Sequence, residues 1–287
     1  MPELPQVEAL ARFLGKQLAG TTLTHAEVVS ISALKTFEHD PADLIGHPIG
    51  AVVRHGKFVD VAVPPLHLVF HLARAGWLVW HEQRPTRRPR GRAGHLAVRI
   101  GVDSGAGFDL IEAGTQHRLA AYIVESPQQV PGVAALGIDP LSPQFTLAVL
   151  AGLLSSAGRA QLKGVLRNQG VIAGIGNAYS DEILHAARLG PFTPAASLDG
   201  RRCEDLYRAI REVLLEALAS ARDQSPDKLK AGKRATLRIH GRTGEPCPVC
   251  ATPIAEVSFA DSSLQYCPHC QTGDRVLADR RMSRLLT

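Results

Sequence analysis

The sequence lacks any continuous apolar run of about 18 residues, so it predicts no membrane-spanning helix. The first residues also lack the basic and apolar blocks of a secretory signal peptide. Cysteine is scarce: the 287 residues include five, four of them paired as CPVC and CPHC, which suits metal binding in a reducing compartment better than disulfides. These absences together predict a cytoplasmic protein.

The excess of positive over negative charge is small. The net charge of +5 and the pI near 9.1 give a small excess of base, which suggests polyanionic partners. Much of it is clustered, because RPTRRPRGR at residues 84–92 holds five arginines and two prolines. Such a segment forms either a solvated arm or a contact for phosphate groups, and the sequence favours neither interpretation.

Apolar spacing divides the chain into regions of different structure. Valine and leucine recur at helical intervals before Gly20, which predicts an opening helix over residues 2–19. From 22 to 124, short β-branched runs broken by glycine and proline predict a β-rich sandwich or barrel. Helical patterns then recur at 146–154, 159–169, 178–188 and 202–222. No internal repeat is found.

This order of elements predicts an α+β chain with several domains. The length allows two or three of them, each with its own core. Four prolines between the β-rich and helical regions indicate a linker. The predicted units are an N-terminal β domain at 1–125, the linker at 126–143, a helical domain at 144–231 and a metal module with the C-terminal tail at 232–287.

The metal module contains two CxxC pairs, Cys247 with Cys250 and Cys267 with Cys270, separated by sixteen residues. This spacing is typical of a tetrahedral zinc site, and the residues between the pairs are predicted to form a β-hairpin. Four thiolates leave no open position for water, so we expect one structural Zn²⁺ ion rather than a catalytic one. Redox use of the pairs is the alternative. Cys203 lies alone in a helical pattern and is predicted to be a buried free thiol.

The segment GVIAGIGN at 170–177 joins two predicted helices. It has only the first two glycines of a dinucleotide-binding GxGxxG and follows a helix rather than a strand, which disfavours a dinucleotide site. Gly174 and Gly176 permit a tight turn that exposes backbone N–H groups at the start of the second helix, a place that binds phosphate. Asn177 and Lys163 would complete such a site. A plain helical hairpin is the alternative.

Three motifs in this order resemble the formamidopyrimidine-DNA glycosylase and endonuclease VIII family: the N-terminal PELP, the GIGN turn, and GRTGEPCPVC with QYCPHCQ. PELP is more similar to the formamidopyrimidine branch. The resemblance implies an N-terminal β-sandwich flanked by helices, a helix–two-turn–helix domain and a C-terminal β-hairpin zinc finger. It also implies a monomer that binds damaged double-stranded DNA at the nucleoid without an organic cofactor.

The resemblance assigns catalytic roles to Pro2, Glu3 and Lys57. Removal of Met1 would leave Pro2 with a free secondary amine, which attacks C1′ of a damaged nucleotide and forms an iminium adduct. Glu3 would be the general acid and base. Lys57 would contact phosphate and assist departure of the leaving group.

The resemblance also implies DNA contacts, with the nucleotide everted from the duplex. Phosphate contacts position the protein without reading sequence, so we expect salt-sensitive binding with little sequence preference. The backbone-binding residues implied are His95, Lys163, Gly176, Asn177 and Arg242. The residues implied to fill the vacated space are Arg74, His117 and Leu119, with Arg118 replacing one of them if the alignment shifts by one position.

The chain departs from the family pattern at three places. Gln6 stands where the family usually has glutamate, which removes a carboxylate near Pro2. Ser262 stands where the family keeps an arginine that holds the phosphate and aids a second elimination, and the candidate substitutes are Arg242 and the arginines of the tail at 271–287. Residues 223–235 are shorter and more basic than the family's lesion-capping loop, which argues against 8-oxoguanine specificity.

We therefore predict a bifunctional DNA glycosylase and abasic-site lyase acting in base-excision repair. A catalytically weakened protein that binds damaged or abasic DNA on the same scaffold is the second hypothesis, supported by Gln6 and Ser262. An RNA-binding zinc protein is the third, supported only by the basic arm. The lesion removed, the preferred opposite base and the mode of elimination are left open.

Overall fold

The computed structural model describes residues 1–87, 95–113, 117–259 and 262–277, with the backbone alone at 233–235. Most of the basic arm and the last ten residues of the tail lie outside this description. The chain forms two compact units: Met1–Leu136 with Ala221–Ala231, and Gly137–Ser220 with Gly232–Thr287. Every helix in the described part of the chain is too short or too polar to span a bilayer.

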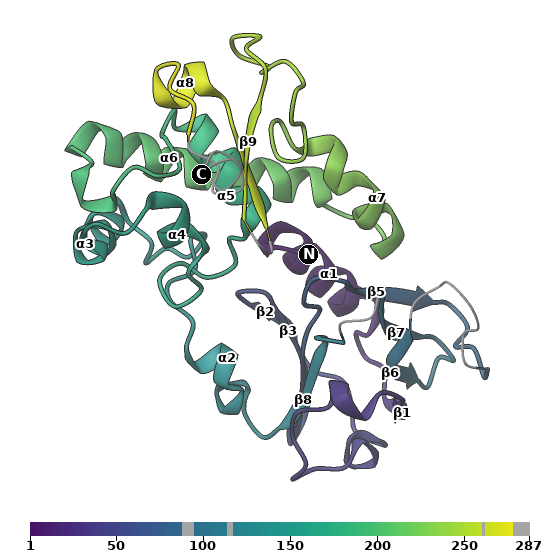
Figure 1. Ribbon diagram of the computed structural model, residues 1–287. Coiled ribbons are helices and arrows are strands. Elements are labelled where there is room, and N and C mark those ends of the chain that lie inside the picture. The colour runs from purple at the N-terminus through teal and green to yellow at the C-terminus, as the bar shows by residue number, and fades with distance from the viewer. Residues whose placement is uncertain (88–94, 114–116, 260–261, 278–287) are drawn as a thin grey trace, which may run out of the picture. The chain divides into compact units, whose positions relative to one another are not determined.

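The first unit is built on two four-stranded antiparallel sheets (Figure 1). One sheet has the order β1–β6–β7–β5, formed by Leu23–Val28, His95–Val102, Gly107–Glu112 and Gly76–His81. The other has the order β2–β3–β4–β8, formed by Val52–His55, Phe58–Val63, Leu66–His71 and Ala120–Val124. The 3₁₀ turns η1 (Ile31–Ala33) and η2 (Pro41–Leu44) connect β1 to β2.

The sheets pack face to face around one apolar core. Phe70 on β4 and Phe108 on β7 are both fully buried, and their ring centroids lie 6.1 Å apart. On β3 the alternate residues Val59, Val61 and Val63 belong to this core, as the period of two in a half-buried strand requires. The predicted sandwich is thereby confirmed.

Helix α1 (Leu4–Gln17) packs against β2 and β3 and confirms the predicted opening helix. Glu3 precedes it in an extended conformation, and Pro5 lies in its first turn, where an N–H would have no helical partner. The chain leaves the helix through Gly20, whose φ of +72° favours glycine.

The predicted linker at 126–143 is partly structured. It contains η3 (Pro127–Gln129) and α2 (Pro131–Ala134). Val130 and Val133 pack with Val69 and Val124 on the face of β4 and β8 turned away from the main core. The proline-rich composition therefore marked short turns that cover the sheet as well as a connection.

The second unit carries the predicted helices and the cysteine hairpin (Figure 1). The helices are α3 (Leu147–Ala157), α4 (Leu162–Arg167), α5 (Asn177–Ala186), α6 (Gly200–Ala221) and the short α8 (Pro268–Thr272), with the 3₁₀ turn η4 (Ala195–Ser197). The hairpin strands are β9 (Ala255–Ser258) and β10 (Ser263–Tyr266), which pair antiparallel.

Helix α7 (Pro226–Thr236) runs across residue 231, where the helical domain was predicted to end. Residues 221–231 belong to the first unit. The indole N–H of Trp77 donates to the carbonyl of Pro226 at 3.1 Å, and Leu229 is buried in the sandwich core. The basic segment, which resembled a loop in sequence, is a helix anchored by an apolar residue among its lysines.

Candidate active site and nucleic-acid interface

Pro2 and Glu3, the predicted nucleophile and general acid, lie at the start of α1. Pro2 is buried, and Glu3 is 2% exposed. The backbone N–H of Glu3 donates to Oε1 of Gln6 at 3.2 Å, and the Glu3 side chain accepts the Gln6 N–H in return. This reciprocal capping works with an amide or a carboxylate at position 6, so Gln6 preserves the geometry of the helix start.

Replacing Gln6 by alanine is expected to lower the free energy of unfolding by about 1 kcal/mol, because the Glu3 N–H loses its acceptor. Gln6→Glu should stay within about 0.5 kcal/mol of the parent chain, because a carboxylate accepts the same N–H. Urea unfolding followed by the fluorescence of Trp77 and Trp80 measures both. An equal loss in the two variants would contradict the capping role.

Lys57 lies in the two-residue turn between β2 and β3, where Gly56 has a φ of +56°. Lys57 is 8% exposed. The buried guanidinium of Arg54 holds this turn to α1, because it donates to Glu8 at 2.9 Å and to the Gly56 carbonyl at 3.2 Å. Arg54 thus joins the β2–β3 turn to the first turns of α1.

The environment of Lys57 keeps a neighbouring histidine neutral. Burial, with a further contribution from the charge of Lys57, lowers the pKa of His71 to about 4. Its Nδ1 accepts the backbone N–H of Ala73 at 3.1 Å, which requires the unprotonated nitrogen. Near neutral pH, His71 is therefore uncharged.

The residues predicted to enter DNA divide into exposed and buried ones. Arg74, His117 and Arg118 have exposed side chains, and so does His95 at the start of β6. Leu119 is 1% exposed and belongs to the sandwich core. In the absence of DNA this side chain holds the core together, and its insertion into DNA stays a prediction.

The predicted turn before α5 is organised by Gln169, which the sequence analysis missed. Its Oε1 accepts the N–H of Gly174 at 2.9 Å, and its Nε2 donates to the Ile175 carbonyl at 2.7 Å. Gly174 has a φ of +90°, so this position needs glycine. Gly176 has ordinary negative φ and forms the buried N-cap of α5.

Lys163, which was predicted to complete a phosphate-binding site, has a buried side chain. It is 5% exposed, and its ammonium donates to Asp181 at 2.5 Å, to Ser180 at 2.9 Å and to the Asn177 carbonyl at 3.1 Å. An ammonium has three hydrogens, and these contacts use them within the fold. Lys163 therefore holds the start of α5, and its phosphate contact stays a prediction.

Asp181 and Asn177 tie this turn to the zinc hairpin. Asp181 also accepts from Nδ1 of His240 at 2.7 Å and from the backbone N–H of Gln265 at 3.2 Å. The Asn177 amide donates to the Ser263 carbonyl at 2.7 Å. The two predicted DNA-binding modules of this unit are therefore joined by buried polar contacts, which sets the position of Asn177.

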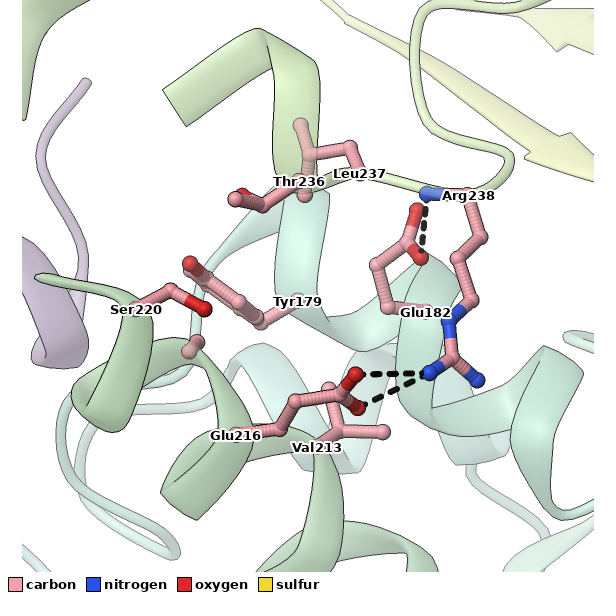
Figure 2. A pocket seen from close by; sticks show the side chains of 9 residues that line it. Tyr179, Glu182, Val213, Glu216, Ser220, Thr236, Leu237 and Arg238 are labelled. Carbon is pink, nitrogen blue, oxygen red and sulfur yellow. Dashed lines mark hydrogen bonds and ion pairs between the residues drawn. The ribbon is translucent and has the colours of Figure 1, made fainter. Parts of the chain in front are cut away.

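Glu182, the residue after Asp181 on α5, also binds the backbone of a distant segment (Figure 2). Its carboxylate accepts the backbone N–H groups of Arg238, Ile239 and His240 at 2.8, 3.0 and 2.8 Å. The Arg238 side chain donates to Glu216 on α6, at 2.9 Å to each oxygen. The cavity beside them holds about 150 Å³, below the roughly 300 Å³ of the smaller ligand sites, so we assign it no ligand.

The four predicted zinc ligands meet at one point. The sulfurs of Cys247, Cys250, Cys267 and Cys270 all lie within 4.8 Å of one another. Three of the separations are 3.4, 3.4 and 4.0 Å, close to the roughly 3.8 Å between sulfurs on a tetrahedral zinc ion. These cysteines form the site of one structural zinc, as predicted.

His185 supports this zinc site from α5. Its Nε2 lies 3.3 Å from the Cys247 sulfur, and the side chain is buried. Burial lowers the pKa of His185, and the charges of Arg238 and Arg188 lower it further, so the ring is neutral and has one N–H to donate. A donor to a ligating sulfur orients the ligand, a role that the CxxC spacing alone does not reveal.

Arg242 and Ser262 lie on loops of the second unit. The Arg242 guanidinium donates to the Leu237 carbonyl at 2.6 Å and to Glu245 at 2.9 Å, with 34% of its side chain exposed. Ser262 lies in the turn between β9 and β10, where its carbonyl accepts the N–H of Phe259 at 2.7 Å. A DNA contact of Arg242 stays a prediction.

Comparison with known proteins agrees with this architecture. Three family models match: the formamidopyrimidine-DNA glycosylase N-terminal domain over 1–115, the formamidopyrimidine-DNA glycosylase H2TH domain over 136–227, and the zinc finger found in FPG and IleRS over 244–273. A formamidopyrimidine-DNA glycosylase of Symbiobacterium thermophilum is 36% identical over 286 residues, which cover 94% of this chain and 89% of that protein.

Solved structures show the same fold over nearly the whole chain. The MutM (Fpg) protein of Thermus thermophilus aligns with a TM-score of 0.79 and 29% identity, over 96% of this chain and 100% of its own. The Lactococcus lactis Fpg in complex with DNA containing an abasic site aligns with a TM-score of 0.80 and 25% identity, over 94% and 99%.

The sandwich, the helix–two-turn–helix element and the four-cysteine hairpin together define a zinc-finger DNA repair glycosylase. The chain belongs to the formamidopyrimidine-DNA glycosylase family. The resemblance drawn from the three sequence motifs is confirmed.

Proposed function

We propose that the chain is a bifunctional glycosylase and abasic-site lyase, which removes an oxidised base through a covalent intermediate at Pro2. The observation that carries this proposal is the Pro2–Glu3 pair, which is buried at the head of α1. The Arg54 contacts connect that helix to the turn that bears Lys57.

The reaction uses one nucleophile and one acid. The Pro2 nitrogen bonds to C1′ as the bond from C1′ to the base breaks, and the base leaves with the proton that the Pro2 nitrogen gives up. Glu3 protonates the sugar ring oxygen, which opens the ring and leaves an iminium ion between Pro2 and C1′. The positive end of the α1 dipole disfavours an ammonium at Pro2 and so favours the reactive amine. Removal of Met1 is required, and mass spectrometry of the intact protein tests it.

The proposed substrate is damaged double-stranded DNA. Support comes from the Lactococcus lactis relative, which binds DNA containing an abasic site. His95, Gly176, Asn177 and Arg242 are the residues proposed at the DNA backbone, and the zinc hairpin positions Asn177 through Ser263. We further propose a monomer without an organic cofactor, acting in the cytoplasm at the nucleoid.

Sodium borohydride tests the intermediate directly, because hydride reduces the iminium ion to a stable amine that links the protein to DNA. Pro2→Gly is expected to reduce trapping on abasic duplex, and Glu3→Gln should lower base release by about 100-fold or more, since the acid is lost. Glu38→Gln changes an exposed acid and serves as control. Unchanged trapping and base release in both site variants would refute the proposal.

A catalytically weakened DNA binder is the second candidate, favoured by the serine at position 262 in the hairpin turn. It predicts salt-dependent binding to abasic duplex with no base release from oxidised purines, oxidised pyrimidines or bulky adducts. Rapid release of a single lesion in this panel would exclude the weakened binder.

A further inference from the structure

Glu112 is a buried acid that none of the proposed catalytic steps uses. It ends β7 and is 3% exposed. Its Oε1 accepts the backbone N–H groups of Arg118 at 2.9 Å and Leu119 at 3.2 Å, and its Oε2 lies 3.1 Å from the Leu119 nitrogen. The carboxylate therefore binds the backbone that leads into β8.

The same carboxylate lies below two exposed histidines. Nδ1 of His117 is 4.0 Å from Oε2 of Glu112. The ring of His117 meets that of His95 edge to face, with centroids 5.2 Å apart. His95 is itself the partner of Glu112 across the β6–β7 pair. One buried carboxyl group thus faces the His117 ring, binds the backbone of Arg118 and lies opposite His95 in the strand pair.

The carboxylate of Glu112 has two tasks. Both oxygens anchor the backbone, since Oε1 accepts from Arg118 and Leu119 and Oε2 accepts from Leu119, while Oε2 is also the oxygen that faces the His117 ring. Leu119 adds an apolar anchor on the far side of the segment, because its side chain is buried in the core. The segment is therefore held by a buried carboxylate and a buried leucine, while the two residues before Leu119 point to solvent.

We propose that Glu112 is a positioning residue that aims His117 and Arg118 into the duplex space vacated by an everted nucleotide. The proposal rests on the proposed function, since the everted nucleotide belongs to that reaction. An imidazole near the opposite base offers hydrogen-bonding nitrogens, and because Nδ1 faces Glu112 at 4.0 Å, Nε2 is the nitrogen left for that contact. Glu112 would therefore influence discrimination among opposite bases without touching DNA.

Two substitutions separate the tasks of the carboxylate. Glu112→Gln keeps an oxygen for the backbone N–H groups but replaces the charge that faces His117. Glu112→Ala removes both. Binding to abasic duplex with each of four opposite bases, and to intact duplex, is measured at constant salt. Glu82→Gln, an exposed acid bonded to Trp80 on the same domain, serves as control.

Glu112→Ala is expected to lower the preference for abasic over intact duplex by about tenfold, since hydrogen bonds to a charged group carry about that factor. Affinity for intact duplex should stay within about twofold, because phosphate contacts are retained. Glu112→Gln should keep most of this preference but should reduce the differences in affinity between abasic duplexes with different opposite bases. His117→Ala should add nothing to that reduction in the Glu112→Gln background.

Unchanged abasic preference in folded Glu112→Ala would overturn the proposal. If Glu112→Ala does not fold, independent effects of Glu112→Gln and His117→Ala on opposite-base discrimination would overturn it instead. Borohydride trapping of the parent chain separates this failure from that of the proposed function. If the parent chain is trapped and the Glu112 variants bind DNA like the parent, only the role of Glu112 is refuted. If the parent chain is not trapped, the proposed reaction itself is refuted.

Discussion

Asp181→Ala is expected to destabilise the second unit by about 3–5 kcal/mol, the cost of leaving one member of a buried ion pair without its partner. The side chain of Asp181 is 1% exposed and that of Lys163 is 6% exposed. The substitution also removes the acceptor for His240 and for the Gln265 N–H. The start of α5 should open, because Lys163 would no longer be held beside the Asn177 carbonyl.

Hydrogen exchange of peptides from α5 measures this local stability, because slowly exchanging amides report the free energy of opening. Asp205→Ala is the matched control, since Asp205 pairs with Arg208 on the exposed surface of the same unit. That loss should cost less than about 1 kcal/mol. Equal protection of α5 in the two variants would contradict the assigned role of Asp181.

Local patterns in the sequence predicted the features that depend on neighbouring residues. The CxxC spacing identified the zinc ligands, because each pair folds two thiolates onto one ion without help from distant residues. The apolar period of α1 and the alternation in the strands gave the helix and the sandwich for the same reason. The motifs at PELP and GIGN supplied the family, which periodicity alone does not give.

The features that the sequence did not predict depend on partners that are distant in sequence. The burial of Lys163 was not predicted, because its charge is visible in the sequence and its pairing with Asp181 is not. Leu119 is buried because it faces the sandwich core, which a sequence position cannot reveal. The positioning contacts of Glu182 and His185 span 56 to 62 residues and were missed for the same reason.

This distinction between local and distant contacts bears on the zinc site, which joins both kinds. The cysteine pairs are local, but the hairpin they close supplies the Ser263 carbonyl that holds Asn177 and the Gln265 N–H that reaches Asp181. A change confined to the metal should therefore alter the helix–two-turn–helix element, whereas the sandwich has its own core and should be unaffected.

Chelation of zinc, or Cys267→Ala, is expected to unfold the hairpin and to weaken binding to abasic duplex by at least about tenfold. Structural zinc contributes about 10–16 kcal/mol of apparent binding energy in zinc-finger peptides at pH 7, and that energy is lost with the metal. Exchange protection should fall in residues 244–259 and 262–272 and at the start of α5. The fluorescence of Trp77 and Trp80 should stay constant, since both lie in the first unit.

Cys203→Ala is the matched control for this experiment, because Cys203 is buried on α6 and is not among the four clustered sulfurs. Metal analysis should find one zinc per chain in the parent and in Cys203→Ala, and none in Cys267→Ala. Retention of abasic-DNA affinity and of α5 protection after zinc loss would show that Asn177 is positioned without the hairpin. The Asn177–Ser263 hydrogen bond would then be a consequence of the fold rather than its support.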